Sequence, residues 1–206
     1  MKKLCFYEID QDYINFLKKF DGKIPNIAYQ THDKFICGVL FEVEGKKYYA
    51  PISSFTKQQR TNILIRNSAG QVTSSIRLSF MFPVPDDKVH IKDFSKEDAY
   101  YRRLLLEEYS YCKKHAHKIA DRAQYIYHAA VTGQDPVIQK NSCNFKKLES
   151  AYEMYINDPS RSHSQSRVPM KDRFAMAKEA AAQRNADRAA SAPTPRPPKK
   201  DDPSLE

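Results

Sequence analysis

The sequence has no tryptophan, no closely spaced cysteine pair and no long apolar run. Its four cysteines form no C-x-x-C pair, which argues against a zinc knuckle and favours reduced thiols: Cys5, Cys37, Cys112 and Cys143. No segment is long enough to cross a bilayer, and the acidic residues Glu8, Asp10 and Asp12 follow the start where a signal peptide would be apolar. These absences predict a cytoplasmic protein without a metal or another cofactor.

A polyanionic partner is indicated by the charge balance. The chain has 206 residues, 41% of them hydrophobic, with 13 tyrosines and 11 phenylalanines, which is enough for one packed core. Lysine and arginine outnumber aspartate and glutamate by 34 to 25, and the formal net charge is +9. Such an excess favours nucleic acid over a membrane surface as the partner.

The first half of the chain has the pattern of strands. Short runs rich in β-branched and aromatic residues are separated by turn residues, and they predict strands at 4–9, 35–41, 47–50, 61–66, 75–84 and 88–91. A short helix capped by Asp10 or Asp12 is expected after the first strand. The runs 35–41 and 47–50 flank a turn with Gly45 and predict a β-hairpin, whose second strand should end at Pro51.

Helices are expected later. Ser95 is the predicted N-cap of a long helix through Cys112, and a second helix should follow from Ile119 to Gly133 after a break at 113–117. A loop at 135–136 and a helix capped by Ser142 complete the core. Strands grouped early and helices late predict an α+β fold.

The composition changes near residue 158. Residues 170–190 are rich in alanine, lysine and arginine and could form an isolated helix, whereas 192–203 are rich in proline. We therefore expect a folded domain at 1–157 and a low-complexity tail at 158–206 that is otherwise disordered.

An ordered set of short motifs resembles the ToxN/AbiQ family of endoribonuclease toxins. The motifs in the hairpin region are Tyr29-Gln30, Phe35-Ile36-x-Gly38, Gly45-Lys46-x-Tyr48 and Ala50-Pro51-Ile52-Ser53-Ser54. Supporting motifs follow in the same order: Leu78-x-Phe80-Met81-x-Pro83, Tyr101-Arg102-x-Leu104-Leu105, Glu108-Tyr109, Lys118-Ile119 and Ser142-Cys143-Asn144-Phe145-Lys146-x-Leu148-Glu149. The resemblance covers residues 1–157, and it is the order of the motifs that is specific.

The resemblance implies a compact, antiparallel, barrel-like sheet of the Kid/MazF-toxin type, with C-terminal helices packed on it. It implies a metal-independent endoribonuclease that leaves 2′,3′-cyclic phosphate and 5′-hydroxyl ends. Its partners would be an mRNA substrate and a small, repeated RNA antitoxin, which the toxin processes and which then inhibits it, within a ring of alternating protein and RNA. Such type III toxin–antitoxin systems act in abortive infection by phage.

The catalytic positions carried over from the family are Tyr29, Lys34, Ser53, Ser54 and Lys57. Two departures concern the lysines: Asp33 stands where some relatives have the basic residue, and Thr56 displaces Lys57 by one place. Metal-free RNA cleavage needs donors for the phosphorane charge and groups that move two protons, which hydroxyls, lysine and tyrosine can supply. Spacing alone favours a solvated polar turn for the loop after Pro51.

Further residues are expected to contact RNA. His32, near Tyr29 and Lys34, could also act as an acid or base. The basic series of the helical region either tracks phosphates or forms a solvated helix face. The full predicted set is His32, Tyr49, Thr56, Arg77, Arg102, Arg103, Lys113, Lys114, Lys118 and Arg122.

Alternatives to these interpretations remain open. Cys112, His115 and His117 have a spacing that suggests a metal, but residues 115 and 117 point in opposed directions on a helix, which favours solvated histidines. A non-catalytic RNA-binding module would bind RNA without any role for Ser53. A toxin directed at a protein, such as a topoisomerase, would need neither Ser53 nor Lys57.

Overall fold

The structure is a computed structural model, and it describes residues 4–26 and 35–158. These residues belong to one compact unit that ends at Asp158. The tail from residue 159, including the helix expected at 170–190, lies outside the described residues. The division of the chain into a domain and a tail therefore stays a prediction.

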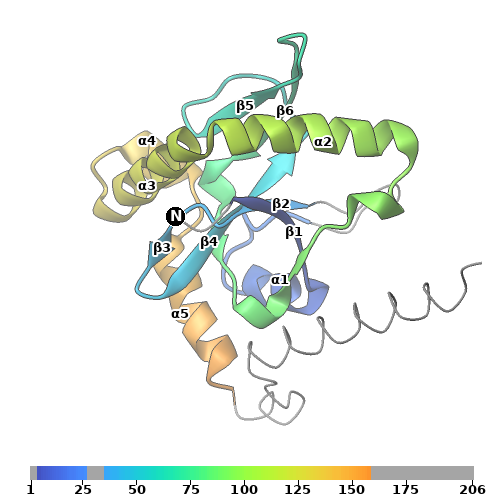
Figure 1. The fold of residues 1–206 in the computed structure, drawn as a ribbon. Helices are drawn as coiled ribbons and strands as arrows, with labels where there is room; N and C mark the ends of the chain where they lie inside the picture. The colour runs from blue at the N-terminus through green and yellow to red at the C-terminus, as the bar shows by residue number, and fades with distance from the viewer. Residues whose placement is uncertain (1–3, 27–34, 159–206) are drawn as a thin grey trace, which may run out of the picture. The chain divides into compact units, whose positions relative to one another are not determined.

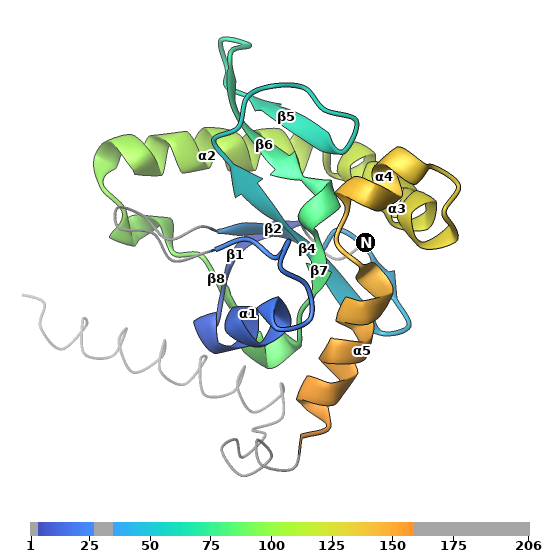
Figure 2. The same ribbon diagram turned by 180° about the vertical axis from the view of Figure 1, so that it is seen from behind.

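Eight antiparallel strands form a single sheet, shown from two sides in Figures 1 and 2. The strands are β1 (Cys5–Ile9), β2 (Ile36–Gly38), β3 (Glu42–Val43), β4 (Lys46–Ser53), β5 (Asn62–Arg66), β6 (Val72–Arg77), β7 (Phe82–Pro83) and β8 (Val89–Ile91). The main path is β5-β6-β4-β2-β1-β8, and β3 and β7 pair with β4. Within the described ranges β5 does not pair with β8, so the α+β fold is confirmed but the sheet is open rather than a closed barrel.

β4 is the centre of this sheet. Its first half pairs with β3 and β7, with Tyr48 opposite Pro83. Its second half pairs with β2 and β6, with Ser53 opposite Ser75. One eight-residue strand therefore fixes the register of four neighbours.

Pro51 does not end this strand, contrary to the sequence prediction. It pairs with Ile36, and β4 continues to Ser53. The next residue, Ile52, donates its N–H to the Phe35 carbonyl on the β2 side, so position 51 faces the opposite side. On that side the partner changes from β7 to β6, and no ladder bond requires the N–H that proline lacks.

The expected hairpin is present, but its first strand is split. The turn between β3 and β4 has Glu44 and Gly45 at φ of 49° and 77°, as in a type I′ turn. Residues 39–41 interrupt the run, although Leu40 and Phe41 still exchange backbone hydrogen bonds with Tyr48. The run 75–84 is likewise broken, by the 3₁₀ helix η1 (Leu78–Phe80) between β6 and β7.

The helices are α1 (Gln11–Lys18), α2 (Ala99–Lys114), α3 (Ala116–Thr132), α4 (Pro136–Asn141) and α5 (Phe145–Ile156), and two further 3₁₀ turns are η2 (Asp86–Lys88) and η3 (Phe94–Lys96). α2 crosses the sheet near β5 and β6, and α1 lies on the other side (Figures 1 and 2). The break between α2 and α3 and the end at Gly133 agree with the prediction.

The expected caps are displaced. Asp98, rather than Ser95, caps α2 by accepting from two backbone N–H groups. Asn144, rather than Ser142, caps α5, and its own N–H donates to Asp21 in the loop after α1. Asp135 caps α4 where only a loop was expected. Equally suitable capping residues stand close together here, and the tertiary contacts decide which one is used.

A buried carboxylate joins the sheet to two helices. Glu149 of α5 accepts hydrogen bonds from the hydroxyls of Tyr48 (2.8 Å) and Tyr127 (2.6 Å), and Lys146 donates to it at 2.8 Å. Burial favours a raised pKa, but these three donors outweigh it and lower the pKa of Glu149. The three contacts hold β4, α3 and α5 together.

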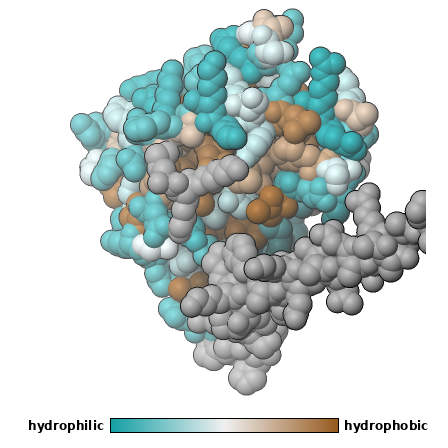
Figure 3. All heavy atoms as spheres, in the orientation of Figure 1, coloured by the Kyte–Doolittle hydropathy of each residue, from teal (hydrophilic) through white to brown (hydrophobic). Residues whose placement is uncertain are grey.

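Charged and polar side chains dominate the upper and left parts of the face in Figure 3, where Figure 1 shows α2 and α3. The outer positions of these helices include the exposed residues Arg103, Lys113, Lys114 and Lys118. Among the described residues, no helix combines the length and the apolar character needed to span a membrane.

Candidate functional site

Ser53 is the last residue of β4 and is partly exposed. It pairs directly with Ser75 of β6, so the two side chains share one face of the sheet. Arg77 lies two residues along β6 and is therefore on the same face. The Ser53 hydroxyl accepts a hydrogen bond from the Phe55 N–H at 3.3 Å. The hydroxyl thus stands at the point where the central strand becomes a loop.

The loop after Ser53 is held by two side chains. The Ser75 hydroxyl donates to the Phe55 carbonyl at 2.6 Å. The buried Asn62 amide donates to the Lys57 carbonyl at 2.9 Å and accepts from the Gln59 N–H at 2.8 Å. The backbone is therefore fixed, and the side chains of Ser54, Thr56 and Lys57 are exposed: two hydroxyls and one ammonium group.

The guanidinium of Arg77 lies over two aromatic rings. The centre of its guanidinium is 4.6 Å from the ring centroid of Phe55 and 5.0 Å from that of Phe80. Its Nη2 donates to Gln59 Oε1 at 3.3 Å. Burial lowers the pKa of Arg77, and an arginine remains charged at neutral pH. A fixed cation therefore belongs to the face of the sheet that carries Ser53.

An open groove of about 870 Å³ continues from this loop to the start of α3. Cationic residues Lys118, Arg122 and Arg66 line it together with Gln58, Tyr111 and Tyr125. Arg122 donates to the Arg60 carbonyl at 2.6 Å, and its guanidinium lies 4.9 Å from the ring centroid of Tyr125. Cations interleaved with aromatic rings are typical of a surface that binds single-stranded nucleic acid.

The structure therefore brings one part of the predicted site together. Ser53, Ser54, Thr56, Lys57 and Arg77 lie on the loop and on the strand beside it. Lys118 and Arg122 line the adjoining groove. Tyr29, His32 and Lys34 lie outside the described residues. Their roles remain predictions.

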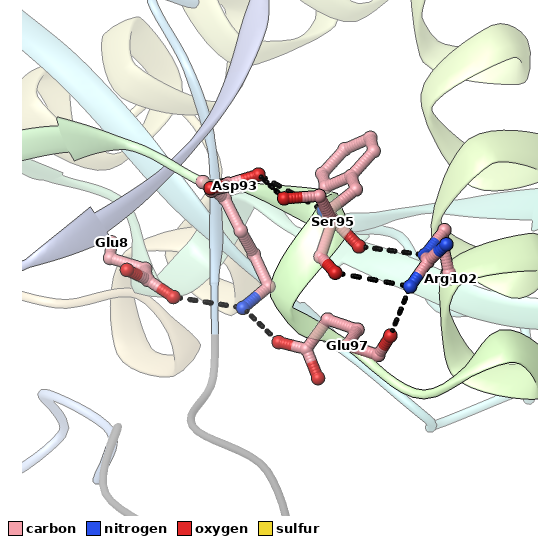
Figure 4. Close-up of polar contacts among 7 residues, drawn as sticks. Glu8, Asp93, Ser95, Glu97 and Arg102 are labelled. Carbon is pink, nitrogen blue, oxygen red and sulfur yellow. Dashed lines mark hydrogen bonds and ion pairs between the residues drawn. The ribbon is translucent and has the colours of Figure 1, made fainter.

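Other predicted RNA contacts have structural partners. Tyr49 is buried, and burial raises the pKa of its hydroxyl. Its ring lies so close to Gly38 that a Cβ on residue 38 would be 2.0 Å from a ring carbon. Arg102 donates to the carbonyls of Phe94 (3.1 Å), Ser95 (3.0 Å) and Glu97 (2.8 Å), as Figure 4 shows. These contacts give Tyr49 a packing role and Arg102 a role in holding η3 against α2.

The same view shows an ammonium group shared by Glu8 and Glu97 (Figure 4). It is that of Lys92, which is buried and bonds to both carboxylates at 2.8 and 2.7 Å. Arg103 pairs with Glu107 at 3.4 Å, while Lys113 and Lys114 are exposed in the last turn of α2. Lys113 and Lys114 therefore have no structural role that a contact within the described ranges shows.

The possible metal ligands do not converge. His115 bonds to the Tyr111 carbonyl at 2.8 Å, His117 pairs with Asp121 at 2.9 Å, and Cys112 is buried. In residues 4–26 and 35–158 no group of three or more histidine, cysteine or acidic side chains is arranged to hold a metal. His115 is therefore held at the junction of α2 and α3, and His117 is paired with the next turn of α3.

Some residues of the site were missed from the sequence. Ser75 and Asn62 hold the loop, Phe55 and Phe80 enclose Arg77, and Tyr111 and Tyr125 line the groove. No local signal marks the two polar residues, because their partners lie on another strand or on the loop that folds back. The pairing of β4 with β6 places Ser75 beside the loop, and the loop folds back onto Asn62 at the start of β5.

Known proteins share both this sequence pattern and this fold. The family model for "Toxin ToxN, type III toxin-antitoxin system" matches residues 5–153. Endoribonuclease ToxN from Pectobacterium atrosepticum is 30% identical over 161 residues, which cover 71% of this chain and 91% of the relative. Endoribonuclease AbiQ from Lactococcus lactis subsp. lactis is 24% identical over 165 residues, or 74% of this chain and 89% of the relative.

Two solved structures have the same fold. One, from work on selective toxin inhibition by a non-coding RNA pseudoknot, matches with a TM-score of 0.70 and 21% identity, covering 76% of this chain and 99% of its own. The other, from work on a processed non-coding RNA that regulates a bacterial antiviral system, has a TM-score of 0.66 and 26% identity, covering 73% and 98%. Because the family model spans most of the described residues and a curated relative reaches 30% identity, the chain belongs to the ToxN toxin family of type III toxin–antitoxin systems.

Proposed function

We propose that this protein is a metal-independent endoribonuclease toxin whose catalytic groups lie on and around the loop after Ser53. The endoribonuclease relatives support RNA cleavage. The observation that carries the assignment of the site is the Ser53 hydroxyl, held at the end of β4 beside Ser75 and followed by the exposed Lys57 on a fixed loop.

The reaction needs no group beyond those available here. A base removes the proton of a ribose 2′-hydroxyl, and the 2′-oxygen forms a bond to the adjacent phosphorus. The P–O5′ bond breaks, O5′ receives a proton from an acid, and the products carry a 2′,3′-cyclic phosphate and a 5′-hydroxyl. The hydroxyls of Ser53 and Ser54 and the ammonium of Lys57 donate to the phosphate oxygens as negative charge develops.

Tyr29 and Lys34 complete the proposed catalytic set, with His32 as a further proton-transfer candidate. The chain reaches them directly from β2: the Phe35 carbonyl accepts from the Ile52 N–H, next to Ser53. Tyr29 would stack on a base or donate its phenol near the scissile phosphate, and Lys34 would add positive charge.

RNA is also the proposed inhibitor. Solved relatives are described as inhibited by an RNA pseudoknot or regulated by a processed non-coding RNA. We propose that this protein cleaves mRNA in the cytoplasm, processes a repeated antitoxin RNA and binds one unit of it within a ring of alternating protein and RNA. The groove with Lys118 and Arg122 would follow the RNA backbone beyond the loop.

Cleavage in excess EDTA tests this proposal directly. Purified wild-type protein should cut a single-stranded RNA and leave cyclic-phosphate ends, and Ser53→Ala should cut at least about 10²-fold more slowly. Tight binding without cleavage by wild type would instead support the non-catalytic RNA-binding module. Growth arrest that persists with Ser53→Ala and Lys57→Ala would support a toxin directed at a protein.

A further inference from the structure

Arg77 and Ser53 are near neighbours on one face of the sheet. Ser53 is opposite Ser75, and Arg77 is its diagonal neighbour on the same face, a Cα separation of about 7 Å in an antiparallel pair. The guanidinium then stacks on Phe55, two residues beyond Ser53. Phe55 is also bonded through its N–H to the Ser53 hydroxyl. One loop segment thus contacts both groups.

The charge of Arg77 is poorly compensated. Within the part of the chain that the structure describes, no carboxylate pairs with it, and its buried Nε donates to no group. Its one hydrogen bond to a described residue is the 3.3 Å contact to the neutral Gln59 amide. A desolvated cation with unused donors is costly by itself and is stabilised by an anion that approaches its accessible edge.

We propose that Arg77 is the charge-stabilising group of the active site, binding a non-bridging oxygen of the scissile phosphate beside Ser53. The inference rests on the proposed ribonuclease function and goes further, by giving the transition-state charge a specific partner. The contacts with Phe55 and Phe80 and the hydrogen bond to Gln59 hold the guanidinium group in place before RNA binds. Lysine has no planar fork and cannot replace this geometry.

The rings also suggest a specific test by chemical rescue. Arg77→Ala removes the guanidinium group that contacts the rings of Phe55 and Phe80, and a free guanidinium ion can take its place. We expect single-turnover cleavage in EDTA to fall at least about 10²-fold in Arg77→Ala. Millimolar guanidinium chloride should restore part of the rate, whereas sodium chloride at equal ionic strength should lower it by weakening RNA binding.

The controls separate catalysis from charge and from folding. Lys19→Gln removes an exposed positive charge at the end of α1 and should keep the wild-type rate. Ser53→Ala retains the guanidinium of Arg77 and should show no rescue. Thermal unfolding by circular dichroism shows whether Arg77→Ala is folded. Arg77→Lys, which keeps the charge and most of the stem, serves as the second variant.

Sulfur substitution gives an independent readout on Arg77→Lys. Replacing one non-bridging oxygen of the scissile phosphate with sulfur should slow the wild-type enzyme in one diastereomer more than in the other. This difference should shrink in Arg77→Lys, because a point charge does not reproduce the oriented fork. A merely structural role for Arg77 would leave the diastereomer difference unchanged.

The outcomes distinguish the inference from the function on which it rests. If wild type does not cleave RNA, the proposed function itself is wrong. If wild type cleaves but folded Arg77→Ala does so within about threefold of it, the inference is wrong. Slow cleavage without guanidinium rescue and with an unchanged sulfur effect in Arg77→Lys would also overturn it.

Discussion

The two ends of β4 differ in whether the cations beside them have carboxylate partners. At the Lys46 end, Lys46 pairs with Glu153 at 2.7 Å and Lys146 with Glu149 at 2.8 Å. At the Ser53 end, Arg77 and Lys57 have no carboxylate partner within the described ranges. Both ends lie on the same eight-residue strand, yet the cations named here have carboxylate partners only at the Lys46 end.

Polar groups at one end of β4 stabilise the fold, whereas those at the other end are available to a ligand. Glu149 is surrounded by donors because an unpaired buried carboxylate would destabilise the fold. Arg77 keeps free donors at a cost to the fold, which is expected where the missing partner is a ligand. Paired charge therefore marks the structural end of β4, and unpaired charge marks the end that we assign to RNA.

Removal of Glu149 should have the largest effect on stability. Glu149→Ala leaves the ammonium of Lys146 and the hydroxyls of Tyr48 and Tyr127 without their acceptor. We expect the free energy of unfolding to fall by about 3–5 kcal/mol, measured by urea denaturation. Glu107→Ala, which breaks a surface pair with Arg103, is the matched control and should cost below about 1 kcal/mol. An equal loss of unfolding free energy in both variants would mean that Glu149 is no more important to the fold than a surface ion pair.

The same carboxylate should make the fold acid-sensitive. Its pKa is lowered in the folded state, so its contribution is present above the unfolded pKa of about 4.3 and is lost as pH falls through the folded value. Glu149→Gln removes this titration. The stability gap between wild type and Glu149→Gln should therefore narrow on acidification, as followed by thermal unfolding from neutral to acidic pH. A gap that widens at low pH would contradict the assignment.

Adding a carboxylate at the Ser53 end should remove the difference between the two ends of β4, because Arg77 would then have an acidic partner as Lys46 does. Gln59 already accepts from Arg77, so Gln59→Glu gives the guanidinium an acidic partner. We expect RNA cleavage to slow at least about tenfold, because the new charge competes with phosphate, while stability stays equal or rises. Gln139→Glu makes the same change on α4 and should leave cleavage unaffected. Equal slowing in both variants would mean that only net charge matters.

A smaller effect is expected in the groove. Lys118→Gln should weaken RNA binding and reduce the slope of log affinity against log salt by about 0.7, the value for one phosphate contact on a single strand. Fluorescence anisotropy at several salt concentrations measures this. Lys96→Gln, an exposed lysine of η3, should leave the slope unchanged. An unchanged slope in Lys118→Gln would place the RNA elsewhere.

The smallest effect on stability should come from Ser53. Its hydroxyl is partly exposed and accepts one hydrogen bond of 3.3 Å. Ser53→Ala should therefore change the free energy of unfolding by no more than about 0.5 kcal/mol, in urea denaturation of the same preparation used for cleavage. A loss above about 2 kcal/mol would show that this end of β4 is structural too.

Much of the fold follows from local pattern. The apolar runs located most of the strands, and the lapse at 113–117 located the break between α2 and α3. The pattern failed where neighbours in space decide the outcome. Pro51 remains within β4 because the adjacent strand changes there, and η1 interrupts the run 75–84 because the chain passes from β6 to β7.

The candidate site also has one part that the sequence could predict and one part that it could not. The hydroxyl pair and Lys57 could be found from the motif after Ala50-Pro51, through the family resemblance. The aromatic partners of Arg77 could not, because Phe55 and Phe80 meet it only through the pairing of β4 with β6 and the turn of η1. Side-chain periodicity also could not show that Arg102 holds η3 while Lys113 on the same helix is exposed, so both were predicted to contact RNA.

The pairing of β4 on both edges has a consequence for local opening. Amide protons of a strand enclosed by neighbours exchange with solvent only after those neighbours separate. We expect the amides of β4 to be among the slowest to exchange in the molecule, and those of the loop at 54–60 to be much faster. Ser53 lies at the boundary between the slowly exchanging strand and the rapidly exchanging loop. Its position is therefore anchored in the segment that opens last, whereas the loop that follows it, although held by Ser75 and Asn62, opens when only a few contacts break.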